Sequence, residues 1–198
     1  YSKGIGRELD PIDGVFELHQ AYQAANPNYT GRVTVPTLWD KKLWTIVNNE
    51  SSDIIRMFNT EFNQWGNADV DLFPKPLRDE IEGYNNRIYP TLNNGVYRCG
   101  FAKSQKSYEE AYHSLFDTLE WLEEHLGTRR YLCGNSVTEA DWRLYVTLVR
   151  FDSVYYSHFK CSKFRICDQH NLWNYLKDLY QKPGIADITD MEGIKAGY

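Results

Sequence analysis

Two short runs rich in β-branched residues lie near the start of the chain, and only segments with helical periodicity follow them. The first run spans residues 32–40 and the second residues 45–47, with Lys41 and Lys42 between them. Runs of this kind around a short polar turn predict a β-hairpin. Two strands alone are marginal in water and leave their edges bare, so we expect further strands to be encoded upstream of Tyr1.

The hairpin is flanked by two predicted helices. Residues 12–25 carry apolar side chains at three-to-four spacing, and the cluster at 26–28 ends the segment. After the second strand, the polar residues 48–53 are typical of a helix start, and an amphipathic run follows at 54–58. This order of helix, hairpin and helix predicts part of an α+β domain over residues 1–62.

The rest of the chain is predicted to be helical. Residues 63–76 are rich in Asn, Gly, Asp and Pro, which indicates a linker before an all-helical domain at 77–198. Thr138 and Asp141 have the spacing of a reciprocal helix cap. The predicted helices of this domain run from 77 to a stop near Pro90, over 108–126 with an end at Gly127, over 142–151, and over 172–179 as a last helix ended by Pro183-Gly184.

Charge and apolar patterning disfavour two classes of partner, and cysteine usage indicates the cellular compartment. A net charge of -5 and a pI near 5.6 disfavour nucleic-acid binding. No apolar run is long enough to cross a bilayer, so we expect no membrane partner. The four cysteines contain no Cys-x-x-Cys pair, which fits a reducing compartment. We therefore expect a cytoplasmic protein, unless an organellar address lies upstream.

One group of four residues has side chains of the types that bind metal ions. His158, Cys161, Cys167 and His170 follow the pattern H-x2-C-x5-C-x2-H, which offers four zinc ligands. The central gap is longer than zinc sites usually have, and three basic side chains in the same stretch would repel a cation. We therefore favour a polar loop with buried thiols and expect no metal.

The dipeptide Val35-Pro36 lies in the first predicted strand, just before the turn. Pro36 has no amide hydrogen, so this bond is either an ordinary edge-strand bond or a cis bond. A cis bond would turn the backbone of Val35 outward, where an extended peptide ligand can pair with it as an added strand. The dipeptide alone leaves the two interpretations equally open.

Glu50 and Ser51 lie at the predicted start of the second helix, where free amides and the positive end of the helix dipole converge. Ser51 can bind a ligand carboxylate and Glu50 a ligand ammonium, which suits a zwitterionic amino-acid end. From these two residues alone, the favoured alternative is that Ser51 or Ser52 merely caps the helix. Arg32 can pair with a second carboxylate or remain an exposed strand-end charge.

Residues 31–42 and 45–59 resemble the glutathione-binding half of xi-class glutathione transferases, the glutathionyl-hydroquinone reductases. The resemblance implies the C-terminal half of a thioredoxin-like domain, a β-hairpin with flanking helices, followed by an all-α helical-bundle transferase domain. It covers nearly the whole chain in order. The segments that continue it are 93–97, 130–132, 138–143, 148–155 and 158–161.

The resemblance also implies a reaction and its site residues. Members of this family use glutathione as a co-substrate to reduce glutathionyl-hydroquinones, and they form homodimers. In this sequence, the backbone of Val35 beside Pro36 would pair with the cysteinyl part of glutathione. Glu50 and Ser51 would hold its γ-glutamyl end, and Arg32 would lie on the glutathione side. The tyrosines that line the quinone pocket correspond to Tyr97, Tyr155 and Tyr198.

The sequence departs from the family at the nucleophile. The family carries its catalytic cysteine in a Cys-Pro-Trp-Ala motif before the hairpin, and residues 1–198 contain no such motif. We therefore expect no catalytic residue in this chain and a nucleophile upstream of it. Cys99, close to Tyr97, is expected to be a small buried thiol. Two alternatives stay open, namely a non-catalytic transferase-like binding or interaction module, and a transferase whose activating Ser or Tyr lies upstream.

Overall fold

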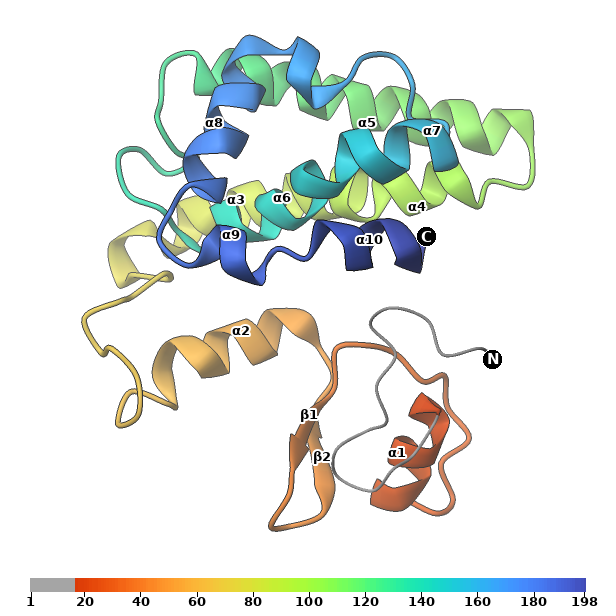
Figure 1. Cartoon of the computed structure of the whole chain (residues 1–198), viewed down its shortest axis with the longest axis vertical. Helices are drawn as coiled ribbons and strands as arrows, with labels where there is room; N and C mark the ends of the chain where they lie inside the picture. The colour runs from red at the N-terminus through yellow and green to blue at the C-terminus, as the bar shows by residue number, and fades with distance from the viewer. Residues whose placement is uncertain (1–16) are drawn as a thin grey trace. The chain divides into compact units, whose positions relative to one another are not determined.

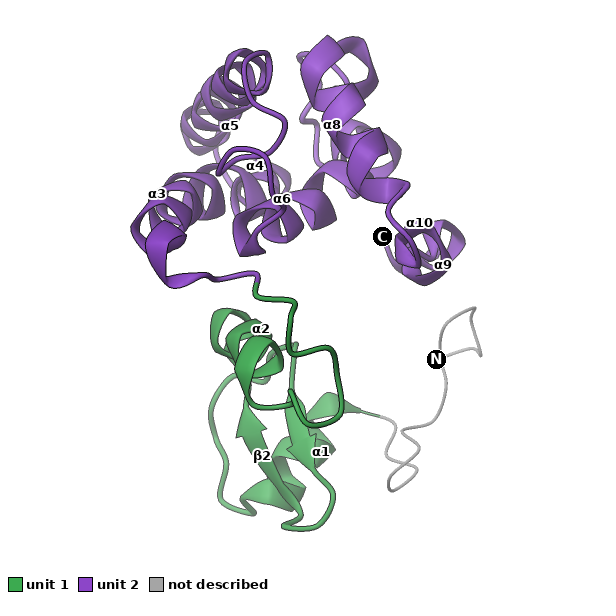
Figure 2. Cartoon of the chain, turned by 90° about the vertical axis from the view of Figure 1, so that its left-hand side faces the viewer, with its two compact units in different colours: residues 1–71 green, residues 72–198 purple. Residues whose placement is uncertain are grey.

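The computed structural model of the chain describes residues 17–198, which divide into two compact units between Asp71 and Leu72 (Figures 1 and 2). Residues 12–16, the start of the first predicted helix, lie outside the described residues. No helix in the described part of the chain has the length and apolar composition that a bilayer span requires.

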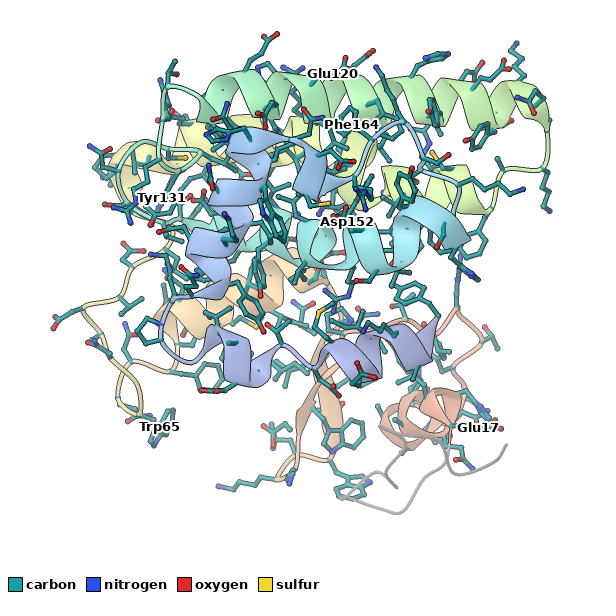
Figure 3. The ribbon with its side chains drawn as sticks, turned by 45° about the horizontal axis from the view of Figure 1, so that its top comes forward. Glu17, Trp65, Glu120, Tyr131, Asp152 and Phe164 are labelled. Carbon is teal, nitrogen blue, oxygen red and sulfur yellow. The ribbon has the colours of Figure 1, made fainter. Side chains whose placement is uncertain are left out.

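Unit 1 contains a two-stranded antiparallel sheet with a helix before it and a helix after it (Figure 1). Its elements are α1 (Leu18–Ala25), β1 (Leu38–Asp40), β2 (Thr45–Asn48) and α2 (Ser51–Thr60). The predicted hairpin with flanking helices is therefore confirmed. Trp65 projects from the turn after α2 (Figure 3), with 73% of its side chain exposed.

The first strand is shorter than predicted. It was expected from residue 32 but begins at Leu38, so Val35-Pro36 precedes the strand instead of lying within it. The amide and the carbonyl of Thr34 both bond to the hydroxyl of Tyr22, and Pro36 has no amide to donate. Groups bonded elsewhere cannot join a ladder, so pairing with β2 begins only after Pro36.

The hairpin turn is wider than the Lys41-Lys42 pair that was expected, because it runs from residue 41 to residue 44. The Asp40 carboxylate accepts hydrogen bonds from the amides of Lys42 and Leu43, at 2.7 and 2.8 Å. Trp44 closes the turn with a φ of 56°, a left-handed conformation that a bulky residue adopts only in such turns. Its ring meets that of Trp39 edge to face at 5.6 Å between centroids.

Unit 2 is helical and is built around one hydrophobic core (Figure 2). The longest helix, α5 (Gln105–Leu126), packs against α4 and α8, and α6 packs against α3 and α8. The other α-helices are α3 (Arg78–Ile88), α4 (Gly95–Gly100), α6 (Glu139–Arg150), α7 (Tyr156–His158), α8 (His170–Tyr180), α9 (Ile185–Ile188) and α10 (Met191–Gly197). Short 3-10 turns lie at Lys75–Leu77 and Ile166–Asp168, and two π-helical turns lie at Tyr89–Asn93 (η2) and Phe151–Tyr155 (η3).

The predicted helix stop near Pro90 is confirmed, because α3 ends at Ile88. The chain then passes through η2 into α4. Pro90 is the second residue of η2 and has no amide hydrogen to donate to a carbonyl of α3. The helix expected to be last, α8, is followed by α9 and α10. Gly184, with a φ of 81°, turns the chain into α9, and four residues are too few to show periodicity.

The predicted cap before α6 is confirmed and centres on one buried carboxylate. Asp141 is fully buried, and it accepts hydrogen bonds from the amide and hydroxyl of Thr138 at 2.8 and 2.9 Å. It also accepts from the amide of Leu132 at 2.9 Å and from the hydroxyl of Tyr175 at 2.8 Å. Asp141 therefore joins the loop before α6, the start of α6 and α8.

We expect Asp141→Ala to lower the free energy of unfolding by about 3–5 kcal/mol, because it leaves several buried donors without an acceptor. Urea unfolding followed by circular dichroism measures the change. The matched control is Asp117→Ala, which removes an exposed carboxylate from α5 and should change stability by no more than about 0.5 kcal/mol. Equal midpoints for the two variants would contradict the role assigned to Asp141.

Candidate functional site

The backbone at Val35 is open to a ligand. Of the two interpretations of the Val35-Pro36 bond, the structure has the cis form. The Val35 side chain is 76% exposed. Within residues 17–198, no hydrogen bond occupies the amide or the carbonyl of Val35. This residue therefore presents one free donor and one free acceptor, the pair that an extended peptide needs for strand addition.

The start of α2 is a second open group of donors. Glu50 is the N-cap residue, and its carboxylate accepts from the amide and hydroxyl of Ser52 at 3.5 and 3.3 Å. The alternative in which Ser51 or Ser52 serves as the cap is therefore wrong. The amide and hydroxyl of Ser51 have no hydrogen-bond partner among the described residues, so both can bond to a ligand.

These two open groups are connected through the residues that precede them. The side-chain amide of Asn49 donates to the Thr34 hydroxyl at 3.3 Å. The Tyr22 hydroxyl donates to the Thr34 carbonyl at 2.8 Å and accepts from Asn49 at 3.0 Å. Val35 and Glu50 each follow one of these bonded residues directly, so the structure brings the two predicted binding segments together. Sequence reasoning assigned no binding role to Tyr22 or Asn49. Tyr22 was not identified because a tyrosine on an apolar helix face resembles a core residue.

Arg32 lies three residues before Val35 and is exposed. No ion pair with another described residue engages its guanidinium. Its carbonyl accepts a hydrogen bond from the Tyr29 hydroxyl at 2.8 Å. A Cβ at Gly31 would lie 2.7 Å from the same hydroxyl oxygen, so only glycine allows Tyr29 to approach this closely. Arg32 thus combines a fixed backbone with a side chain that can pair with a ligand carboxylate.

The three predicted quinone-pocket tyrosines meet in unit 2. The Tyr97 hydroxyl lies 2.6 Å from that of Tyr198 and 3.3 Å from that of Tyr155. The hydroxyls of Tyr155 and Tyr198 are 3.1 Å apart, which completes a triangle. The three residues come from α4, from the end of η3 and from the end of the chain. This triangle of hydroxyls is called the tyrosine cluster below.

Phe159 forms the wall behind the tyrosine cluster. Its ring centroid lies 5.4, 5.5 and 5.9 Å from those of Tyr97, Tyr155 and Tyr198. A Cβ at Gly100 would overlap the Phe159 ring, so this close approach requires glycine. Sequence reasoning assigned no role to Phe159, although it lies in one of the matched segments. The cluster therefore combines hydroxyl groups with an apolar aromatic surface.

Burial favours the protonated form of two tyrosines in the cluster. Burial raises the pKa of Tyr155, and burial also raises the pKa of Tyr97. Tyr155 is 2% exposed, whereas Tyr198 is 40% exposed and opens the cluster to solvent. Protonated phenols can donate hydrogen bonds to an oxygen of a bound ligand.

The η3 turn that carries Tyr155 is held at both ends. Asp152, labelled in Figure 3, accepts hydrogen bonds from the amides of Ile166 and Cys167 at 2.6 and 3.0 Å. The carbonyl of Tyr155 accepts from the amide of Cys161 at 3.1 Å. The segment after η3 therefore folds back on the turn and fixes the position of Tyr155.

Three of the four cysteines are inaccessible. Cys99, Cys133 and Cys161 are 4%, 8% and 0% exposed, so the prediction of a buried thiol at Cys99 is confirmed. Cys167 is exposed, so the expected loop with buried thiols is correct for Cys161 and wrong for Cys167. Burial raises the pKa of Cys133 to about 11. Among residues 17–198, no three His, Cys, Asp or Glu side chains form a group that could hold a metal ion.

Iodoacetamide at pH 8 should therefore alkylate the native protein once, at Cys167, because the other thiols are buried. Intact mass spectrometry counts the adducts, and peptide mapping locates them. Cys167→Ser is the matched control and should take up no label. The same protein in denaturant should take up four adducts, one for each cysteine. Rapid native labelling at Cys99 would contradict the assignment of that thiol as buried.

The comparisons with known proteins agree with this fold. The family model described as "Glutathione S-transferase, C-terminal domain" matches residues 105–178. The glutathionyl-hydroquinone reductase YqjG of Escherichia coli K12 is 54% identical over 181 residues, covering 91% of this chain and 55% of the relative. The glutathione-bound structure of YqjG superposes with a TM-score of 0.93 at 52% identity, over 96% of this chain and 62% of that one.

Glutathione transferase Xi 1 from Trametes versicolor gives a TM-score of 0.93 at 48% identity, over 97% of this chain and 68% of that one. The chain therefore belongs to the xi class of glutathione transferases. The predicted fold class, a thioredoxin-like half followed by a helical transferase domain, is confirmed. The chain spans 55% of the length of the Escherichia coli reductase that it matches.

Proposed function

We propose that the protein to which this chain belongs uses glutathione to reduce glutathionyl-hydroquinones. The observation that carries the proposal is the juxtaposition in unit 1 of two open groups, the Val35 backbone and the amide and hydroxyl of Ser51, joined through Thr34 and Asn49. The relative from Escherichia coli is a glutathionyl-hydroquinone reductase, and its structure contains bound glutathione.

Glutathione has two carboxylates, one ammonium and an extended central peptide, and unit 1 offers a partner for each. The central cysteinyl residue would pair with the amide and carbonyl of Val35, next to Pro36. The γ-glutamyl carboxylate would bind the amide and hydroxyl of Ser51 at the start of α2, where the helix dipole favours an anion. Glu50 would accept from the ammonium, and Arg32 would pair with the second carboxylate.

The tyrosine cluster would bind the hydroquinone part of the substrate. Phenolic donors from Tyr97, Tyr155 and Tyr198 can stabilise negative charge on a hydroquinone oxygen. Because burial keeps the pKa of Tyr97 and Tyr155 raised, both still carry the proton that this hydrogen bond requires. The ring of Phe159 supplies the apolar wall for the aromatic ring of the substrate.

The proposed chemistry begins with attack on the glutathionyl thioether sulfur and ends with a thiol–disulfide exchange. A thiolate attacks this sulfur, the bond between sulfur and ring carbon breaks, and that carbon takes a proton. The hydroquinone leaves, and a mixed disulfide with glutathione remains. A second glutathione thiolate then attacks the mixed disulfide and releases glutathione disulfide and the original thiolate. We assign the nucleophile to a cysteine outside this sequence, because the accessible Cys167 has a pKa raised by partial desolvation and by the Asp152 carboxylate.

The proposal extends to location and assembly. Four free cysteines suit a reducing compartment, so we place the protein in the cytoplasm. The xi-class resemblance supports a homodimer that needs no metal. Glutathione and glutathionylated hydroquinones are its proposed partners, with neither nucleic acid nor membrane among them.

Ser51→Ala should raise the dissociation constant for glutathione about tenfold, because the ligand carboxylate loses a hydroxyl donor. Isothermal titration of the full-length protein measures it. Ser104→Ala is the matched control, since Ser104 also lies at a helix start and accepts from the Ser107 amide at 3.1 Å, but belongs to unit 2. This control should lose stability and keep its affinity for glutathione. Unchanged affinity in Ser51→Ala would contradict the proposed carboxylate site.

Turnover distinguishes an enzyme from a binding module. The full-length protein should convert glutathionyl-menadiol, the hydroquinone form, and glutathione into menadiol and one equivalent of glutathione disulfide, which chromatography quantifies. Tyr155→Phe should lower the rate about tenfold and leave glutathione affinity unchanged, because it removes one donor from the tyrosine cluster. Glutathione binding without any turnover would overturn the reductase proposal and favour a non-catalytic module.

A further inference from the structure

The hydroxyl of Tyr22 is the centre of a hydrogen-bond network that links three segments of unit 1. It donates to the Thr34 carbonyl at 2.8 Å and lies 3.4 Å from the Thr34 amide, which donates to it. It also accepts from the side chains of Asn49 at 3.0 Å and Thr37 at 3.4 Å. Tyr22 is 3% exposed, whereas Thr34 and Asn49 lie at the surface. These four residues are called the Tyr22 network below.

We propose that Tyr22 is a positioning residue for glutathione, because its hydroxyl fixes the separation between the Val35 backbone and the Glu50-Ser51 helix start. This inference rests on the proposed function. Val35 and Glu50 lie fifteen positions apart in the sequence and belong to different loops. The bonds that join these loops run between Thr34, Asn49 and the hydroxyl of Tyr22. A ligand that contacts both segments binds more tightly when their spacing is held before it binds.

A second tyrosine supports the same segment. The ring of Tyr29 contacts that of Tyr22, with centroids 4.9 Å apart. Its hydroxyl donates to the carbonyl of Arg32, two residues before the carbonyl of Thr34 that Tyr22 holds. Carbonyls two residues apart lie on the same side of an extended chain. The two phenols therefore occupy one side of residues 32–34, and the backbone groups of Val35 stay unpaired.

The pKa of the Tyr22 hydroxyl agrees with its central place in the network. Burial alone would raise the pKa of Tyr22, but the hydrogen bonds from Thr34, Thr37 and Asn49 outweigh it and lower the pKa to about 8. Several donors thus converge on one oxygen. Losing that oxygen would leave Asn49 and Thr37 without the acceptor that they share.

The test is Tyr22→Phe in the full-length protein, which keeps the ring and removes the hydroxyl. The matched control is Tyr131→Phe, because Tyr131 is also 3% exposed and its hydroxyl donates to Asp178 at 2.6 Å in unit 2. Both variants should lose some stability. Only Tyr22→Phe should weaken glutathione binding, by about tenfold. Isothermal titration and urea unfolding give the two readouts.

Kinetics separates positioning from a purely structural role. Tyr22→Phe should raise the KM for glutathione about tenfold and leave kcat within about twofold, because the ordered ligand geometry is regained once glutathione is bound. A variant that is merely less folded would show a lower kcat at an unchanged KM. That second pattern would overturn the inference.

A further variant keeps the inference testable if Tyr22→Phe does not fold. Asn49 is exposed, so Asn49→Ala should fold and still weaken glutathione binding about fivefold. Where both single variants fold, the double variant should bind hardly more weakly than Tyr22→Phe, since both changes break one network. Wild-type affinity in Tyr22→Phe or Asn49→Ala would overturn the positioning role. A wild-type protein that binds no glutathione would instead overturn the proposed function, and this inference with it.

Discussion

The hydrogen bonds between Thr34 and the Tyr22 hydroxyl hold the segment of unit 1 that leads into the sheet. Both backbone groups of Thr34 are bonded to a side chain, so they cannot continue the ladder of β1. The three residues between Thr34 and Leu38 stay outside the sheet, and Val35 among them keeps a free amide and carbonyl. These free groups are available for strand addition next to the helix start.

Unit 2 positions the tyrosine cluster with irregular helical turns. A π-helical turn inserts an extra residue into a helical path and changes the direction of the side chains that follow it. The η2 turn precedes α4, which carries Tyr97, and η3 ends at Tyr155. Asn93 fixes η2 on α6 by donating to the Arg143 carbonyl and the Thr147 hydroxyl. The helical core that Asp141 stabilises thus supports two π-helical turns, η2 and η3. Both turns help to position tyrosines of the cluster.

Sequence reasoning succeeded where local signals decide structure. The hairpin, α5 with its end at Gly127, and the cap at Thr138 and Asp141 all depend on periodicity or on neighbouring side chains. It failed where contacts between residues far apart in the sequence determine the structure. The strand begins only at Leu38, and the backbone of Thr34 before it bonds instead to Tyr22, twelve residues earlier in the chain. Candidate binding residues could be named from the family motif, but Tyr22, Asn49 and Phe159 become visible only when their partners are known.

The chemistry of the four thiols separates what this chain contributes from what the proposed reaction needs. Thiol–disulfide exchange begins with an accessible thiolate, and its rate falls as the thiolate fraction falls. Cys99, Cys133 and Cys161 are buried among core residues, where neither substrate nor glutathione can reach them. Cys167 is accessible, but partial desolvation and the Asp152 carboxylate raise its pKa and so lower its thiolate fraction. The described residues therefore offer donors, acceptors and aromatic surface to the two proposed substrates, whereas the attacking sulfur of the proposed reaction has to come from a cysteine with a different environment.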